Sequence, residues 1–353
     1  MKRVLFVSRD YNARNDGGSA VAKRNLAFLK ALGLQVAELT IGVPSLAVRL
    51  KNVLLRESYG DRRSLRKQLK YHLSQPYDFV FFDGSHYGVY LREFARHGFK
   101  TICFFHNVEV DYYQQKYKTT HQPQDKLMVG FIAHNERCCI DHASYLITLN
   151  ERDNRQLQKR YHRGADFILP TSFDAYDAAE HHDPVKLPEQ YLLFVGTNFF
   201  ANKEAMDYYI KEIAPSVHIP LLVVGNIAEA FQDATAMPNV HFLGRVDDLA
   251  PYYLQATAVV APILSGSGLK TKTVEALRYG KYVIGSAEAF DGIPILNYPG
   301  AGCECHNTSD YISLINSLKV AKTNEASLRL FDEQFSTATQ LKRFNEFIMS
   351  TAQ

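Results

Sequence analysis

Residues 261–286, A-P-I-L-S-G-S-G-L-K-T-K-T-V-E-A-L-R-Y-G-K-Y-V-I-G-S, decide the fold of the second half of the chain. The apolar residues 258–262 predict a strand, and residues 271–279 predict a helix that ends at Gly280. Two glycines between these elements allow the backbone to come close to a ligand. Because the first amide groups of a helix are free and its macrodipole is positive there, this arrangement predicts an anion site.

Two lysines and one glutamate indicate which anion binds. Lys270 and Lys272 add positive charge where a phosphate group is expected. Glu275 lies about one turn inside the helix, where a carboxylate can accept hydrogen bonds from ribose hydroxyl groups. The pattern therefore predicts a nucleoside diphosphate as the ligand. The alternative is an ordinary glycine-rich turn with solvated lysines.

The spacing of these residues resembles the nucleotide-sugar signature of retaining family 4 glycosyltransferases of the GT-B fold, in particular a bacterial surface polysaccharide type. That signature, G-S-G-x-K/R-x-K-x-x-E-A followed by G-K-x-V-I, is matched from Gly266 to Ile284. Many relatives have a further glutamate before the glycine loop, where this chain has Ser265 or Ser267. The resemblance implies that the donor is bound by Ser267, Gly268, Leu269, Lys270, Lys272 and Glu275, with Lys270 and Glu275 also catalytic.

Length and composition bound the rest of the interpretation. A chain of 353 residues with 46% apolar residues is expected to fill two cores. Its net charge of +3 is too small to indicate nucleic acid. The five cysteines and the lack of an apolar leader are expected for the reducing cytosol. No apolar run is long enough to span a membrane, so membrane contact is expected to be peripheral.

Alternating strand and helix patterns predict an α/β chain of two doubly wound, Rossmann-like domains with parallel sheets. In the GT-B fold such domains face a cleft. We expect an acceptor domain over residues 1–168, a connection over 169–188 and a donor domain over 189–335. Residues 336–353 are expected to form a helix returning toward the first domain, as part of a helical pattern over 327–349.

The first domain is predicted to open with a strand over residues 4–8, a polar loop over 9–19 and a helix over 20–32. The loop is not G-x-G-x-x-G, so the dinucleotide fingerprint is absent. The resemblance implies that this loop faces the cleft, and it carries over Gly17, Gly18 and Ser19 as binding residues. The alternative is a surface loop.

Polar residues follow two further predicted strands of this domain. The strand over residues 101–105 leads directly into His106, which the resemblance places near the reacting sugar as a catalytic residue. A core or capping histidine is the alternative. The strand over 79–83 ends in Asp83-Gly84-Ser85-His86, a second polar cluster of lower specificity.

The second domain is predicted to begin with a strand over residues 191–195, and a later strand is expected over 240–245. Each is followed by a loop that resembles a donor-binding loop of the family. The resemblance implies diphosphate contacts from Gly196, Thr197, Asn198 and Lys203, and base contacts from the backbone of Gly244, Arg245 and Val246. Backbone recognition leaves the identity of the base open.

Residues 49–72 form a basic segment with eight arginines and lysines and only two acidic residues. Leucines and valines lie between the charges. This composition is typical of a surface that binds anionic lipid headgroups, or of a solvated helix face.

These patterns and the resemblance imply a retaining, hexosyltransferase-type enzyme of polysaccharide biosynthesis. It would move a sugar from a nucleoside diphosphate to a glycan or lipid-linked glycan at the cytoplasmic face of the membrane, with no cofactor. Lysines and helix amides would replace a metal, although Cys303, Cys305 and His306 leave a zinc site as an alternative. A nucleotide-sugar epimerase and an inactive sugar-nucleotide-binding partner of an assembly complex are the other two interpretations.

Overall fold

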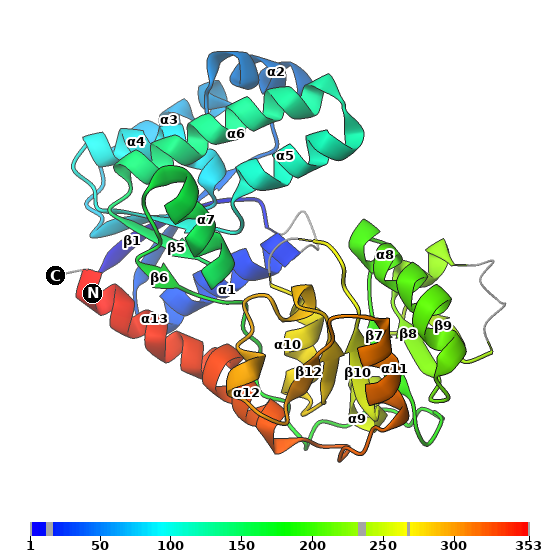
Figure 1. Cartoon of the computed structure of the whole chain (residues 1–353). Coiled ribbons are helices and arrows are strands. Elements are labelled where there is room, and N and C mark those ends of the chain that lie inside the picture. The colour runs from blue at the N-terminus through cyan, green and yellow to red at the C-terminus, as the bar shows by residue number, and fades with distance from the viewer. Residues whose placement is uncertain (1, 12–16, 232–237, 267–268, 352–353) are drawn as a thin grey trace. The chain divides into compact units, whose positions relative to one another are not determined.

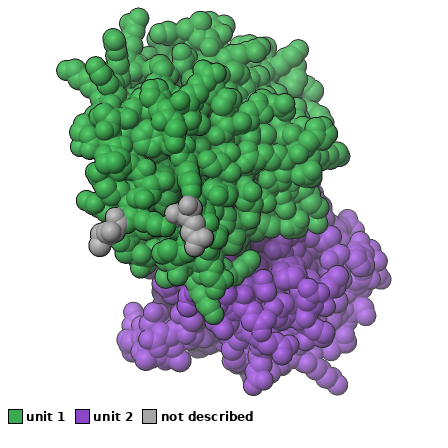
Figure 2. All heavy atoms as spheres, turned by 90° about the vertical axis from the view of Figure 1, so that its left-hand side faces the viewer, with its two compact units in different colours: residues 1–170, 341–353 green, residues 171–340 purple. Residues whose placement is uncertain are grey.

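The computed structural model describes residues 2–11, 17–231, 238–266 and 269–351. Its contacts divide the chain into two compact units, coloured separately in Figure 2: unit 1 is residues 1–170 with 341–353, and unit 2 is residues 171–340. Each unit contains a six-stranded sheet, and every strand pair in both sheets is parallel. The predicted α/β fold of two Rossmann-like domains is confirmed.

The sheet of unit 1 has the strand order β2-β1-β3-β4-β5-β6. Figure 1 labels β1, β5 and β6 of this sheet. Its strands are β1 Arg3–Arg9, β2 Gln35–Ile41, β3 Phe79–Asp83, β4 Thr101–Phe105, β5 Tyr145–Thr148 and β6 Phe167–Ile168. The α-helices are α1 Gly17–Ala31, α2 Leu46–Leu55, α3 Arg62–Leu73, α4 Gly88–Arg96, α5 Glu109–Thr120, α6 Pro123–His142 and α7 Glu151–Tyr161. Side chains of β1 alternate between two buried clusters, one containing Leu5 and Val7 and the other Val4 and Phe6, so helices cover both faces of the sheet.

The sheet of unit 2 has the order β12-β11-β10-β7-β8-β9. Its strands are β7 Leu192–Val195, β8 Leu221–Val224, β9 Val240–Gly244, β10 Ala258–Ala261, β11 Val283–Gly285 and β12 Gly302–Glu304. The α-helices are α8 Phe200–Tyr208, α9 Ala250–Gln255, α10 Thr271–Arg278, α11 Thr308–Asn316 and α12 Glu325–Phe335, and α13 Thr337–Thr351 follows.

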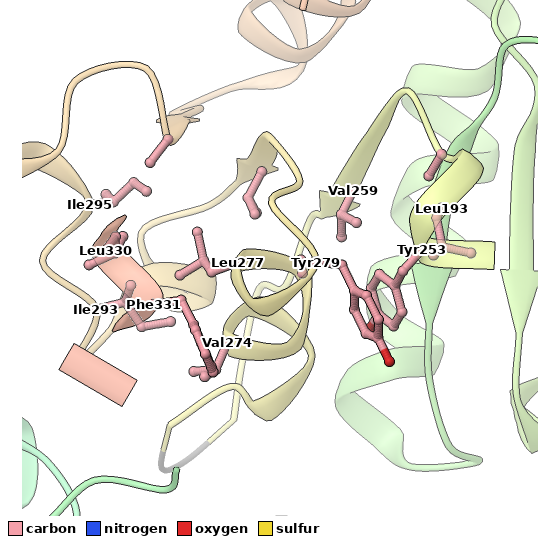
Figure 3. Packing of buried hydrophobic residues seen from close by; sticks show 14 of the residues in the cluster. Leu193, Tyr253, Val259, Val274, Leu277, Tyr279, Ile293, Ile295, Leu330 and Phe331 are labelled. Carbon is pink, nitrogen blue, oxygen red and sulfur yellow. The ribbon is translucent and has the colours of Figure 1, made fainter. Parts of the chain in front are cut away.

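Helix α10, which follows the signature loop, is embedded in the core of unit 2. Figure 3 shows Val274 and Leu277 of α10 on the side of Leu330 and Phe331 of α12. Beyond its C-terminal end the ring of Tyr279 stacks on Tyr253, with 4.9 Å between ring centroids. Packing on both sides fixes the helix and therefore the position of its N-terminal end.

Two sequence-based expectations about helix boundaries are wrong. The first polar loop is shorter than predicted, because α1 already begins at Gly17 and the two glycines lie in its first turn. The helix expected over 327–349 is interrupted at Ser336, whose backbone is extended with ψ 141. There the chain pairs with Phe173, whose amide donates to the Phe335 carbonyl at 3.1 Å and whose carbonyl accepts from Thr337 at 2.9 Å. The boundary between the units falls inside α13, after Gln340.

The basic segment 49–72 also differs from a single amphipathic stretch. It divides into most of α2 and nearly all of α3, which are separated by a left-handed Arg56 and a loop. In α3 Leu65 and Leu69 are buried, whereas the leucines of α2 are exposed. In the part of the chain that the structure describes, no helix is both long and apolar enough to cross a membrane.

Gly88, the first residue of α4, allows close contact with α6. A Cβ atom at Gly88 would lie 1.9 Å from the backbone oxygen of Asn135, whereas a Cβ at Gly130, within α6, would meet nothing within 4 Å. We expect Gly88→Ala to lower the free energy of unfolding by roughly 2–3 kcal/mol through overpacking. The matched variant Gly130→Ala should raise it by about 0.5–1 kcal/mol, because alanine is the better helix former. Urea denaturation followed by circular dichroism measures both, and equal stability of the two variants would contradict the packing described.

Candidate functional site

In unit 2 three glycines bring the loops after β7, β8 and β9 together. Gly225 has φ +117, and a Cβ there would lie 2.1 Å from the carbonyl oxygen of Gly196. The amide of Gly225 donates to the Gly244 carbonyl at 2.7 Å. Only glycine allows this approach, because another residue would be both strained and in collision. The predicted residues Gly196 and Gly244 therefore lie at one edge of the sheet, where the parallel strands end.

Lys272, on the first turn of α10, contacts residues at the same edge of the sheet. Its Nζ lies 4.1 Å from the centroid of the Phe194 ring and donates a hydrogen bond to Oδ1 of Asn202. Burial, with repulsion from Lys270 as the smaller cause, lowers the pKa of Lys272 to about 7. A bound anion would favour the charged form of this lysine and so oppose the effect of burial.

Asn202 is a site residue that sequence reasoning did not identify. Besides accepting from Lys272, its side-chain amide donates to the carbonyl of Thr197 at 2.9 Å. In the same loop, the amide of Asn198 donates to Oδ1 of Asn226 at 3.0 Å. Asn202 therefore connects the β7 loop to α10. Its place in the F-F-A-N-K segment was the only signal available, and that segment contains no charge pattern that singles it out.

Lys270 has an acidic partner in the loop after β11. Its Nζ lies 2.7 Å from Oε1 of Glu288, and both side chains are mostly buried. Sequence reasoning did not identify Glu288 either. A phosphate group that binds Lys270 has to compete with this carboxylate or share the ammonium with it.

Glu275 lies on the first turns of α10, as predicted. Burial raises the pKa of its carboxyl above the usual range, while Arg278 and Tyr253 oppose that shift. The side chain is partly exposed. A partly buried carboxylate at this position can accept hydrogen bonds from hydroxyl groups, as the ribose assignment requires.

Two helices begin at this edge with amides that no described side chain caps. Lys270 is the extended N-cap of α10, and Phe199 is the extended N-cap of α8. Another contact ties the glycine loop to α8, since Oγ of Ser265 donates to the carboxylate of Glu204. The free amides and the two lysines together make this edge suited to an anion.

The remaining predicted donor residues are less closely tied to the lysines. Ser267 and Gly268 lie outside the described residues. Leu269 and Val246 pack against the core of unit 2, and Lys203 and Arg245 are exposed. The remaining predictions on this edge therefore depend on backbone groups or on side chains that face solvent.

In unit 1 the predicted His106 is held by an acidic residue of the neighbouring strand. Its Nε2 lies 3.0 Å from Oδ2 of Asp83, and Oδ1 of Asp83 accepts from Nδ2 of Asn25 at 2.7 Å. Asp83 is almost wholly buried and His106 is partly exposed. The two polar clusters that the sequence suggested separately are therefore one, with the imidazole oriented by a buried carboxylate.

The first turn of α1 lies near the end of β1. Oγ of the buried Ser19 is 3.4 Å from Nη2 of Arg9. Gly17 and Gly18 precede it in the helix rather than in a loop. Of these three residues only Ser19 brings a side chain to this part of unit 1.

The described residues hold no group of three or more histidine, cysteine, aspartate or glutamate side chains that could bind a metal ion. Cys305 is buried, and burial raises the pKa of its thiol to about 12, with Cys303 adding to the shift. The zinc alternative for residues 303–306 therefore finds no support in this geometry.

Comparison with known protein families gives a match in unit 2. Residues 189–315 match the family model "Glycosyl transferases group 1". A search of curated protein sequences gives no match. The match covers most of unit 2, including the lysines and the glycine loops of the candidate site.

Solved structures resemble the whole chain. Anabaena HepE, in a complex with UDP, has a TM-score of 0.66 and 14% identity, covering 99% of this chain and 100% of that one. The lipopolysaccharide outer core galactosyltransferase WaaB has a TM-score of 0.65 and 12% identity, covering 99% of each chain. WaaG, a glycosyltransferase involved in lipopolysaccharide biosynthesis, has a TM-score of 0.60 and 16% identity, covering 98% of this chain and 99% of that one. Matches at such identities show the fold.

The predicted resemblance is thereby confirmed: residues 189–315 match the group 1 glycosyltransferase model, and the chain has the fold of the GT-B glycosyltransferases.

The low pKa of Lys272 has a consequence for stability. In the unfolded chain this lysine keeps its proton up to about pH 10, whereas in the folded chain its pKa is about 7. Between these values the unfolded state binds more protons, so the free energy of unfolding rises with pH, by at most about 1.4 kcal/mol per pH unit. Between pH 7 and pH 9 we therefore expect the free energy of unfolding of the wild type to rise by roughly 1–2 kcal/mol more than that of Lys272→Met.

Urea denaturation of both proteins at the two pH values measures this gain. Methionine keeps an unbranched apolar chain against Phe194, and other titrating groups, such as Lys281, are common to both proteins and cancel. If the difference in the free energy of unfolding between the two proteins does not change with pH, Lys272 keeps its ordinary pKa in the folded chain.

Proposed function

We propose that this chain transfers a hexose-type sugar from a nucleoside diphosphate to a glycan or lipid-linked glycan, with retention of anomeric configuration. The observation that carries the proposal is the pair Lys270 and Lys272 at the uncapped start of α10, inside the segment that matches the group 1 model. Unit 2 is the donor half in this proposal, and unit 1 is the acceptor half.

The lysines and helix amides act on the leaving group. When the bond between the sugar and the diphosphate breaks, negative charge grows on the phosphate oxygen, and Lys270, Lys272 and the first amides of α10 stabilise it. Asn202 positions Lys272 for this role, and the partly buried Glu275 binds the ribose hydroxyls. These groups supply the positive charge that a divalent metal would otherwise bring, so we propose a transfer that needs no metal.

The loops after β7 and β9 complete the donor site. We assign Gly196, Thr197, Asn198 and the exposed Lys203 to the diphosphate and its sugar, and the backbone of residues 244–246 to the base. Ser267, Gly268 and Leu269 belong to the glycine loop that passes the diphosphate. HepE has been solved with UDP, with UDP and glucose, and with UDP-glucose, so uridine is the first base to test.

His106 is the proposed catalytic group of unit 1. Because Oδ2 of Asp83 accepts a hydrogen bond from Nε2 of His106, the imidazole is oriented. Among the described residues Nδ1 has no hydrogen-bond partner, and we propose that it binds a sugar hydroxyl. Ser19 and the backbone of Gly17 and Gly18 lie at the carboxyl edge of the same sheet and are proposed as further binding groups. This half is where the glycan acceptor would bind.

We further propose that the protein acts in the cytoplasm, at the inner face of the membrane, on an acceptor used in polysaccharide biosynthesis. The basic segment 49–72 supports this, because Arg63, Arg66, Lys67 and Lys70 are all exposed on α3. Arg62 contributes less than its charge suggests, since Nη2 pairs with Glu93 at 2.7 Å.

Two substitutions test the donor site. Lys270→Ala removes a positive charge that would bind the diphosphate. Glu275→Gln replaces one acceptor oxygen with a donor and removes the negative charge that would hold the ribose hydroxyls. Each is therefore expected to weaken binding of the correct nucleoside diphosphate by roughly tenfold to a hundredfold. Isothermal titration calorimetry with UDP, GDP and ADP measures the change after a thermal-shift screen has found the base.

The matched control for these variants is Lys319→Ala, an exposed lysine of unit 2 outside the candidate site. It should bind nucleotide as the wild type does. If Lys270→Ala and Glu275→Gln are folded and keep wild-type affinity, the assignment of the donor site is wrong.

Sugar transfer is expected to continue in excess chelator, because the lysines and amides already stabilise the leaving group. Product formation from a sugar nucleotide and a panel of glycan and lipid-linked acceptors is measured with and without chelator. Loss of transfer in chelator that magnesium or manganese restores would refute metal independence. The same assay separates the other interpretations, since turnover without an acceptor indicates an epimerase, and binding without transfer to any acceptor indicates an inactive partner.

A further inference from the structure

Helix α2 carries its leucines on the outside of unit 1. The exposed fractions are 73% for Leu46, 56% for Leu50 and 76% for Leu54, and their spacing of four residues places all three on one face. Leu55 and Val43 are also exposed and extend the apolar surface at both ends. A helix that packs on a core turns such residues inward. This one presents an apolar face to its surroundings.

A polar residue occupies the inner side of α2. Asn52 is the only buried residue of the helix, and its Nδ2 donates to the carbonyls of Ser58 at 2.9 Å and Gly60 at 2.7 Å. Below it, Asn135 of α6 donates to the Glu57 carbonyl at 2.9 Å and accepts from Oγ of Ser58 at 2.7 Å. These hydrogen bonds and Val53, which packs against the buried cluster that contains Phe131 and Ile132 of α6, hold the C-terminal end of α2 over α6 (Figure 1). The outer leucines take no part in that attachment.

The charges at this face indicate what covers it. The helix contains no acidic residue, and Arg49, Lys51 and Arg56 are all exposed at its borders. An apolar face bordered by long cationic side chains is complementary to a bilayer interface, because leucines enter the acyl region while the cations reach anionic headgroups. An apolar groove of a protein would not require the cations.

The neighbouring helix α3 adds exposed positive charge, which attracts anionic lipid from a longer distance than the leucines can. Its Arg63, Arg66, Lys67 and Lys70 are exposed, and none of them makes an ion pair within the described residues. Attraction of this kind depends on ionic strength, whereas burial of leucines does not weaken when salt screens the charges.

We propose that α2 inserts its leucine face into the interface of an anionic bilayer, and that burial of these leucines, in addition to the charge of residues 49–72, holds the protein on the membrane. This inference rests on the membrane contact given above as part of the proposed function. It divides that contact into a salt-sensitive part from the cations and a salt-resistant part from Leu46, Leu50 and Leu54.

Vesicle flotation of the full chain separates the two parts. The vesicles are phosphatidylcholine, with or without phosphatidylglycerol, at low and high salt. We expect the triple variant Leu46→Gln, Leu50→Gln, Leu54→Gln to lose roughly tenfold or more of the partition constant for anionic vesicles at both salt concentrations. The variant with glutamine at Arg63, Arg66, Lys67 and Lys70 should lose binding mainly at low salt, where the charges act at longer range. Leu296→Gln, which changes an exposed leucine of unit 2, is the matched control and should bind as the wild type does.

Each outcome decides a different point. If the leucine variant floats like the wild type while the basic variant does not, insertion is wrong and the electrostatic membrane contact stands. If the wild type binds none of the vesicles, the membrane contact itself is wrong, and the donor-site assignment is tested separately by nucleotide binding. If sedimentation without lipid shows a dimer that the leucine variant dissociates, the face joins two copies of the chain, which also overturns insertion.

A single tryptophan gives a second measurement that does not depend on loss of binding. The chain contains no tryptophan, so Leu50→Trp places one reporter on the proposed membrane face. Its fluorescence should shift to shorter wavelength when anionic vesicles are added and be quenched by brominated lipid. An unchanged spectrum with vesicle-bound protein would overturn the proposal.

Discussion

Both units depend on parallel strands that are buried on both faces. The residues of β3, β4, β8 and β10 are all buried, so helices have to cover each side of each sheet. The only charged side chain in these four strands, Asp83, lies at the end of β3. The parallel direction brings the ends of the strands to one edge, and for this reason Asp83 meets His106 in unit 1 and the glycine loops meet in unit 2.

At the edge of the unit 2 sheet, Lys270 and Lys272 lie in surroundings that disfavour an isolated positive charge. Lys272 is held against an aromatic ring and a single amide oxygen, and Lys270 is paired with Glu288. Without an anion the first lysine has a low pKa and the second has a carboxylate partner. In the proposed function a diphosphate at this edge would favour the charged form of Lys272 and would share Lys270 with Glu288, so its binding and the stabilisation of a leaving group would have the same physical origin.

Helix α2 follows the opposite rule from its neighbour α3. In α3 Leu65 and Leu69 are buried and the charged residues 62, 63, 66, 67 and 70 are exposed, as expected for a helix on a sheet. In α2 an asparagine lies inside and the leucines lie outside. A hydrogen-bonded anchor can hold a helix without using its apolar face, and that face is then left for an acyl interface.

Local patterns in the sequence determined the strands, the glycines that follow them, the helix α10 and the resemblance to a glycosyltransferase family, because these depend on neighbours a few residues apart. Tertiary structure alone decided the partners. Asn202 and Lys272 are 70 residues apart, and Glu288 meets Lys270 only because β10 and β11 are adjacent. Composition marked residues 49–72 as basic and apolar, but which side of α2 faces water is set by packing on α6, and no periodicity within ten residues encodes that packing.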